Sequence, residues 1–141
     1  MDSYIINQWN NTVSNGDIII HLGDFALCNF DKIKVYANKL NGLKYLIKGN
    51  HDHATNTFYE SCGIQIMPHG HRLEFGEDNK YILSHKPLID KDIPEGYINY
   101  HGHIHNTLLS HNYSKELHKC VSVECLDDYK PLLLEKHINI I

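Results

Sequence analysis

Two short apolar runs in this chain each end in a glycine and a cluster of polar residues, and this pattern constrains the fold most strongly. Residues 17–22 are too few for a helix and rich in β-branched side chains, so they predict a buried strand ending at Gly23-Asp24. Residues 44–48 predict a second strand, which ends at Gly49-Asn50-His51-Asp52. Because ligands bind at the carboxyl edge of parallel sheets, the pattern predicts an α/β fold with a polar site at that edge.

Helices are predicted before and between these two strands. Apolar side chains recur at helical spacing in residues 3–13, around Trp9, and again in residues 30–40. From residue 64 onward the pattern changes to short strands, which are predicted at residues 64–67, 72–75, 80–84, 97–100, 119–124 and 131–134. This order, with βα units first and a more antiparallel half later, predicts two packed sheets flanked by helices.

Length and composition indicate an ordinary globular chain. Its 141 residues fit one domain spanning residues 1–141, and 42% of them are apolar, enough for a core without disulfide support. No segment has the roughly 20 consecutive apolar residues of a membrane span, and the N-terminus lacks the regions of a signal peptide. We therefore expect a cytoplasmic protein with no membrane partner. The scattered cysteines are expected to be free thiols: Cys28, Cys62, Cys120 and Cys125.

The charge balance makes a large nucleic acid an improbable partner. The formal net charge is −4, and Arg72 is the sole arginine in the sequence. If the chain binds an anionic ligand, the positive charge at the site must therefore come from metal ions. The 12 histidines can supply imidazole ligands, which suit Zn, Fe and Ni, while aspartate also accommodates Mn.

Four separate segments each place oxygen or imidazole ligands after a predicted strand. These ligands are Asp24, Asn50, His85 and the pair His103 and His105. Each segment alone could also have a purely structural role, since a Gly-Asp pair is commonly a turn or a helix cap and loop histidines are commonly solvated. Together they offer the carboxylate, amide and imidazoles that a two-metal centre requires, with ions about 3.5 to 4 Å apart. The neighbouring glycines, Gly23, Gly49 and Gly102, would let the backbone approach the ions closely.

In this order the segments resemble the calcineurin-like metallophosphoesterases. The matching blocks are Gly23-Asp24, Gly49-Asn50-His51-Asp52, His85 and Gly102-His103-Ile104-His105. The resemblance implies an α/β fold whose two-sheet β-sandwich core is flanked by helices. It also implies metal-dependent hydrolysis of phosphate mono- or diesters by a metal-bound hydroxide, with a small phosphoester as the substrate.

The resemblance also implies a role for each matching residue. Asp24 would bridge two divalent ions, which could be Mn, Fe, Ni or Zn. One ion would be completed by Asn50, His85 and His103, and the other would be bound by His105. In the reaction, His51 would be the acid that protonates the leaving group, and Asp52 would orient His51.

The first block of the family's signature, Asp-x-His, is absent from this chain. The chain is therefore expected to be N-terminally truncated relative to the family and to lack its first strand, which would expose a sheet edge or open a gap and favour a homo-oligomer. Asp24 and His105 alone would hold the second ion weakly, so one ion is expected here where the family has two. The alternative function is a catalytically impaired metal-binding remnant or a non-enzymatic binding module.

His21 is a further candidate ligand near the site. It lies three residues before Asp24 in the predicted strand. Strand geometry places its side chain on the opposite face and about 10 Å away along the chain, so we expect a structural role for it.

Overall fold

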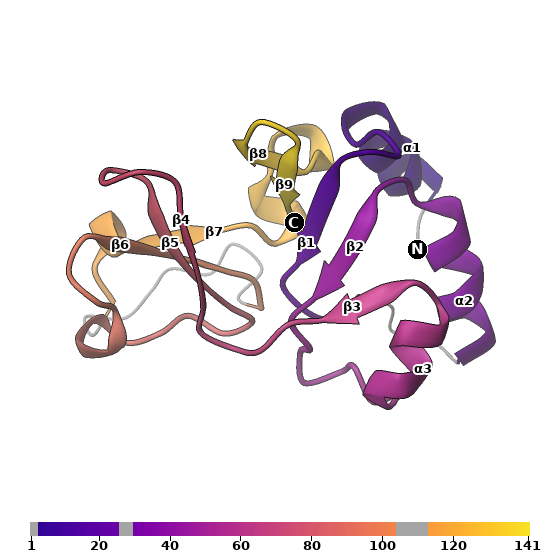
Figure 1. Ribbon diagram of the computed structural model, residues 1–141, viewed down its shortest axis with the longest axis horizontal. Helices are drawn as coiled ribbons and strands as arrows, with labels where there is room; N and C mark the ends of the chain where they lie inside the picture. Colours follow the sequence, from indigo (N-terminus) through magenta and orange to yellow (C-terminus); the bar gives the residue numbers. More distant parts are fainter. Residues whose placement is uncertain (1–2, 26–29, 104–112) are drawn as a thin grey trace.

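The computed structural model describes residues 3–25, 30–103 and 113–141, which form two mixed sheets and a group of helices (Figure 1). One sheet has five strands in the order β3-β2-β1-β9-β8, and the other has four in the order β4-β5-β6-β7. Three α-helices pack on the outer side of the five-stranded sheet within the described ranges (Figure 1). The expected fold class, α/β with two packed sheets, is confirmed.

The elements have the following bounds. The helices are α1 (Ser3–Thr12), α2 (Phe30–Lys39) and α3 (Asn56–Ser61). The five-stranded sheet contains β1 (Ile18–His21), β2 (Leu43–Leu46), β3 (Ile64–Ile66), β8 (Leu132–Glu135) and β9 (Ile138–Ile140). The four-stranded sheet contains β4 (His71–Glu74), β5 (Lys80–Ser84), β6 (Tyr97–His101) and β7 (His118–Cys120).

The five-stranded sheet is apolar on both faces because each face covers a separate core. Successive side chains of a strand point to opposite faces, and β1 follows this rule: Ile19 joins the cluster of α1 and α2, whereas Ile20 joins the cluster facing the second sheet. Trp9 of α1 is 1% exposed in the first cluster. In the second cluster, Leu83 of β5 and Ile140 of β9 are fully buried. The first core therefore packs the helices on the five-stranded sheet, and the second packs the two sheets together.

Parallel pairing brings the predicted ligand segments to the same edges of the sheets. β1 pairs in parallel with β2, so the loops that follow His21 and Leu46 leave the sheet side by side. β5 likewise pairs in parallel with β6, with Ser84 opposite His101 in the register. His85 and His103 therefore emerge next to each other from the second sheet.

Several sequence-based expectations are wrong in detail. The second sheet is not mainly antiparallel, because β5, β6 and β7 are parallel and β4 alone pairs antiparallel, with β5. Residues 85–96 between β5 and β6 include the 3-10 turn Asp90–Asp92, a crossover long enough for parallel pairing. The strand predicted at 119–124 ends at Cys120 and is followed by a 3-10 turn, Val123–Cys125.

The described five-stranded sheet has no gap beside β1, contrary to our expectation. β9, which the sequence analysis missed, pairs in parallel with β1 and antiparallel with β8. The main chain of Ile141 continues this contact, donating to Ile20 O at 2.9 Å and accepting from Leu22 N at 2.8 Å. β9 therefore completes the hydrogen bonding of β1 on that side. None of the described helices is both long and apolar enough to cross a membrane.

The burial of β9 predicts a large difference between two apolar truncations. Ile140 is fully buried, whereas Leu133 of β8 is 61% exposed. Replacing a buried isoleucine by alanine typically lowers the free energy of unfolding by about 2 to 5 kcal/mol. In urea titrations we expect Ile140→Ala to show a loss of this size and Leu133→Ala a loss below about 0.5 kcal/mol. Equal losses would contradict the central position of β9.

Candidate metal centre

Two glycines allow the loops after β1 and β2 to approach His85 closely. A Cβ at Gly23, whose φ is +107°, would lie 2.2 Å from His85 Nδ1. A Cβ at Gly49 would lie 2.4 Å from Asp24 Oδ1. These separations are far below van der Waals contact, so no larger residue fits at either position without displacing the site. At Gly102 the nearest atom to an added Cβ would be 3.4 Å away, an ordinary contact, so this third glycine is under less constraint.

The carboxylate of Asp52 joins the loops after β1 and β2. Asp52 is 5% exposed. Its Oδ2 accepts hydrogen bonds from Asp24 N at 2.6 Å and from Gly49 N at 2.7 Å, and its Oδ1 accepts one from Phe25 N at 2.9 Å. Bonds between a carboxylate and backbone amides are among the stronger ones in proteins. Asp52 therefore fixes the position of Asp24 relative to the second loop.

His85, the first residue after β5, lies at the centre of the cluster. Its side chain is 2% exposed, and its Nδ1 lies 2.7 Å from the carbonyl oxygen of Leu22. Because a carbonyl can only accept, Nδ1 carries a proton and donates it to Leu22. In the neutral ring, Nε2 then has a free lone pair. A bond from the second nitrogen to a backbone carbonyl is the usual arrangement for a histidine that binds a metal.

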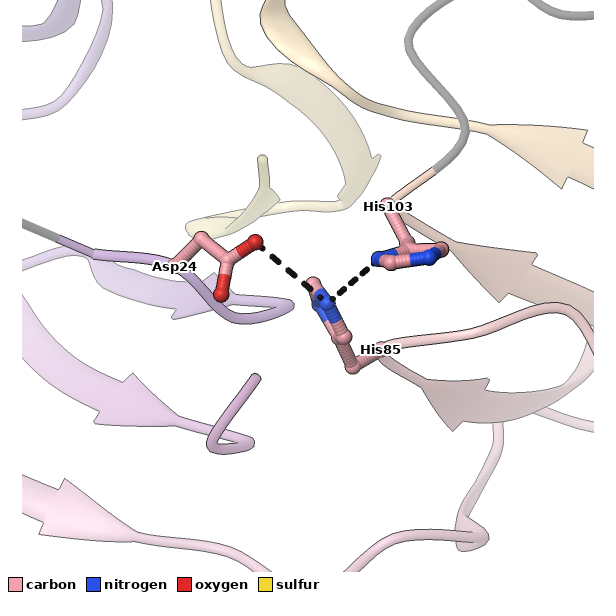
Figure 2. Close-up of side chains that lie close together, drawn as sticks. All are labelled: Asp24, His85 and His103. Carbon is pink, nitrogen blue, oxygen red and sulfur yellow. Dashed lines mark hydrogen bonds and ion pairs between the residues drawn. The ribbon is translucent and has the colours of Figure 1, made fainter. Parts of the chain in front are cut away.

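Three ligand-type atoms surround Nε2 of His85, and Figure 2 shows the two that come from Asp24 and His103. Asn50 Oδ1 lies at 2.9 Å, His103 Nδ1 at 3.1 Å and Asp24 Oδ2 at 3.5 Å. One ligand atom from each of Asp24, His85 and His103 falls within 4.8 Å of the others, and this group could hold a metal ion. Asp24 and His103 both have left-handed backbone, with φ of +56° and +71°, which turns their side chains toward His85.

The chemistry of this cluster fits a cation. The lone pair of His85 Nε2 and the oxygens of Asn50 and Asp24 all present electron density to one another. When Nε2 of His85 carries no proton, this nitrogen and the two oxygens have no hydrogen bond to give one another, whereas a divalent ion between them can bind each one. One carboxylate, one amide oxygen and two imidazoles form a mixed oxygen and nitrogen set of the kind that binds divalent metal ions.

His21 lies closer to the cluster than the sequence analysis predicted. It lines the same cavity, of about 90 Å³, as Asp24, His85 and His103, and Ser122 and Glu124 also line this cavity. The expectation that His21 and Asp24 lie on opposite faces is wrong, because the chain turns at Gly23 and does not continue as a strand. His21 Nδ1 accepts the N–H of Gly23 at 3.1 Å.

The surroundings of His21 agree with a structural role. Its ring stacks on Trp9, with the centroids 6.3 Å apart, and meets the edge of Phe25 at 5.4 Å. Burial is the main reason that its pKa is lowered to about 4. His21 therefore stays neutral at pH 7 and packs between apolar rings.

The other predicted site residues lie around this cluster. Asn50 and His51 are exposed, and the backbone N–H of His51 donates to Asp24 Oδ1 at 3.0 Å. The ring of His53 lies 6.4 Å from that of His51. The hydrogen bonds of Asp52 go to backbone amides, so the role that we predicted for it toward His51 stays a prediction. His105 lies outside the described residues.

Residues 121–124 also line the site cavity, which the sequence analysis did not predict. The segment contains Val121, Ser122, Val123 and Glu124. We predicted a strand here, and a strand alone does not indicate which cavity its residues face. No motif or ligand spacing marks Ser122 or Glu124.

The sequence and the structure of this chain are similar to those of a few known proteins. No protein-family model matches the chain. The uncharacterized protein MJ1445 of Methanocaldococcus jannaschii is 32% identical to it over 148 residues, covering 100% of this chain and 75% of MJ1445. Among solved structures, the protein of unknown function AQ665 from Aquifex aeolicus matches with a TM-score of 0.62 and 25% identity, covering 91% of this chain and 78% of AQ665.

A second solved structure matches part of this chain. The nuclease MPE of Pseudomonas putida is 26% identical to it and matches with a TM-score of 0.44. The match covers 62% of this chain and spans 44% of the nuclease, less than half its length.

The tight approach at Gly49 predicts a cost for the smallest possible side chain. Because its Cβ would meet Asp24 and His85, Gly49→Ala should lower the free energy of unfolding by about 1 to 3 kcal/mol, as overpacking does. Gly16→Ala is the matched control, since nothing lies within 4 Å of a Cβ there. Urea titrations should show no loss for the control. A Gly49→Ala protein as stable as the wild type would contradict the packing.

The lowered pKa of His21 predicts a pH dependence of stability. The folded pKa is about 4, against 6.5 for an unperturbed histidine. Between pH 6.5 and pH 4, His21 is protonated in the unfolded chain but neutral in the folded chain. The free energy of unfolding should therefore fall by about 1.4 kcal/mol for each pH unit that the pH is lowered. His21→Asn keeps an acceptor for Gly23 but cannot titrate. Urea titrations in EDTA at pH 7, 6 and 5 should show a shallower fall for this variant, and equal slopes would count against the assignment.

Proposed function

Because this chain belongs to the calcineurin-like metallophosphoesterases, we propose that it hydrolyses small phosphate mono- or diesters with a divalent transition metal held by Asp24, Asn50, His85 and His103. The single observation that carries this proposal is the convergence of these side chains on His85 Nε2 from four separate strand ends. A cation held there would neutralise charge on the phosphoryl oxygens and make a water molecule more acidic.

The chain's own residues would prepare the site for this reaction. The backbone carbonyl of Leu22 accepts the N–H of His85 Nδ1, so His85 Nε2 stays available as a metal ligand. Asp52 holds the loops of Asp24 and Gly49 in place before the substrate arrives. A site fixed in advance does not spend binding energy on its own ordering.

We assign to His51 the protonation of the leaving alkoxide. Its ring is exposed beside the cluster, and its backbone is fixed by the bond to Asp24 Oδ1. A general acid must reach the leaving oxygen of the bound ester, and an exposed ring next to the cation ligands can do so.

The substrate is proposed to be compact and anionic. Beside Asn50 and His85 lies an open cavity of about 400 Å³, which is also lined by Lys48, His69 and Lys86. Pockets of about 300 to 1,000 Å³ hold ligands of small-molecule size. The basic lining favours a phosphoester over a neutral ester. We place this activity in the cytoplasm.

The proposed cation site is tested by changing one ligand charge. Asn tolerates left-handed backbone, so Asp24→Asn preserves the loop and an acceptor for His51 while removing the carboxylate. In calorimetric titrations with Mn²⁺ we expect this variant to bind at least about tenfold more weakly than the wild type. Asp31→Asn, the same change at an exposed position of α2, is the control and should bind as the wild type does. Undiminished binding by Asp24→Asn would overturn the site.

The proposed acid is tested separately from the cation. His51→Ala should bind Mn²⁺ like the wild type, yet hydrolyse alkyl phosphodiesters about 10² to 10⁴-fold more slowly. Esters with a nitrophenol leaving group need less acid assistance and should lose less. His53→Ala, an exposed neighbour, is the control. Mn²⁺ binding without turnover of any of these esters by the wild type would instead favour a non-enzymatic binding module.

A further inference from the structure

Two cysteines that the proposed function does not use lie in contact with each other. Cys120 ends β7, and Cys125 ends the following 3-10 turn, Val123–Cys125. Their Sγ atoms are 2.8 Å apart, and both residues are thiols. The turn folds the chain back on itself through a hydrogen bond from Cys125 N to Ser122 O at 2.7 Å. A disulfide has an S–S length of about 2.05 Å, so a small movement would suffice to form one.

The pair is accessible to a small oxidant. Both cysteines are partly exposed, whereas Cys62 is 8% exposed. Cys125 lines a cavity of about 250 Å³ together with Lys119, Lys130 and Asp127. Two cationic side chains and one anionic one surround this opening, so it suits an anionic oxidant.

The residues between the two cysteines form a wall of the metal site. Val121, Ser122, Val123 and Glu124 line the cavity that contains Asp24, His85 and His103. Cys120 also lies opposite His101 in the pairing of β7 with β6. His101 in turn lies two residues before His103. A covalent bond between Cys120 and Cys125 would therefore act on a segment that lines the same cavity as the proposed cation ligands.

We propose that Cys120 and Cys125 are a redox-sensitive modification site, which forms a reversible disulfide with a glutathione-type oxidant and thereby alters the metal cavity. One thiolate attacks oxidised glutathione, forming a mixed disulfide and releasing one glutathione thiolate. The second thiolate then attacks the protein sulfur of that disulfide, forms the Sγ–Sγ bond and releases the other glutathione. The two protons of the protein thiols end on the two glutathione molecules, so atoms and electrons balance.

The short loop keeps such a bond reversible. The disulfide would enclose residues 121–124 alone. Closing a short loop removes little entropy from the unfolded chain, so the bond gains less stabilisation than a long-range one. Disulfides of cytosolic proteins are usually transient and serve catalysis or redox sensing.

The first experiment maps the bond. The full chain is incubated with oxidised glutathione, its remaining thiols are alkylated, and its peptides are analysed by mass spectrometry without reduction. We expect a link between Cys120 and Cys125 that dithiothreitol reverses, with Cys62 alkylated. Glutathione left on a single cysteine, or a link through Cys28 or Cys62, would overturn the proposal. Cys125→Ser should retain one glutathione per chain at Cys120, and Cys62→Ser, the matched control, should form the link as the wild type does.

The second experiment tests the effect on the metal cavity, which rests on the proposed cation site. Mn²⁺ affinity is measured by calorimetry for the reduced and the oxidised wild type and for Cys125→Ser treated in the same way. We expect oxidation to change the affinity of the wild type by at least about fivefold, and that of Cys125→Ser to stay unchanged. Equal affinities of both wild-type forms would overturn the effect on the cavity. Absence of Mn²⁺ binding by the reduced protein would instead refute the cation site, while the mapped link would stand.

Discussion

The arrangement of the candidate site depends on one buried carboxylate. Asp52 accepts backbone N–H groups from both sides of the site, from Asp24 and Phe25 after β1 and from Gly49 after β2. Without a partner of this kind, three backbone amides would lose their hydrogen bonds, at about 1 to 3 kcal/mol for a fully buried amide such as that of Phe25. The carboxylate is itself stabilised by the three donors. It determines where Asp24 lies, and Asp24 in turn provides the charge of the cluster.

The second half of the site comes from the other sheet. His85 and His103 follow β5 and β6, whose parallel register places them side by side. The packing of Leu83 against Ile20 and Ile140 joins the two sheets through an apolar core. The cluster therefore spans two sheets, and the volume of the apolar side chains between them sets the distance between the sheets.

The sequence was informative where residue type and position in a strand act together. The cluster of Asp24, Asn50, His85 and His103 could be anticipated because each of these residues follows a predicted strand. The short β-branched run of β1 indicated the parallel pairing that brings Asp24 and Asn50 together, whereas the parallel pairing of β5 with β6, which brings His85 to His103, was not predicted. Asp52 could be recognised as part of a motif, but not as an acceptor of three amides, since hydrogen-bond partners 27 and 28 residues away leave no sequence pattern.

Local conformation and distant pairing were less predictable. The turn at Gly23 brings His21 toward Asp24, and the alternation of a continuous strand cannot anticipate that bend. α3 has six residues, too few to display a helical period, although Thr55 caps it through Phe58 N. β9 is a three-residue apolar segment, and nothing within it indicates that its partner is β1.

The position of β9 has a consequence for folding. Ile18 pairs with Leu43 on one side and with Ile138 on the other, so one neighbour of β1 is near in sequence and the other is 120 residues away. Long-range pairings form slowly because a long loop must first close. During synthesis β1 can pair with β2 early, but its other edge stays open until residues 138–140 leave the ribosome. Open edges of this kind recruit other strands, so the nascent chain is most exposed to aggregation in that interval.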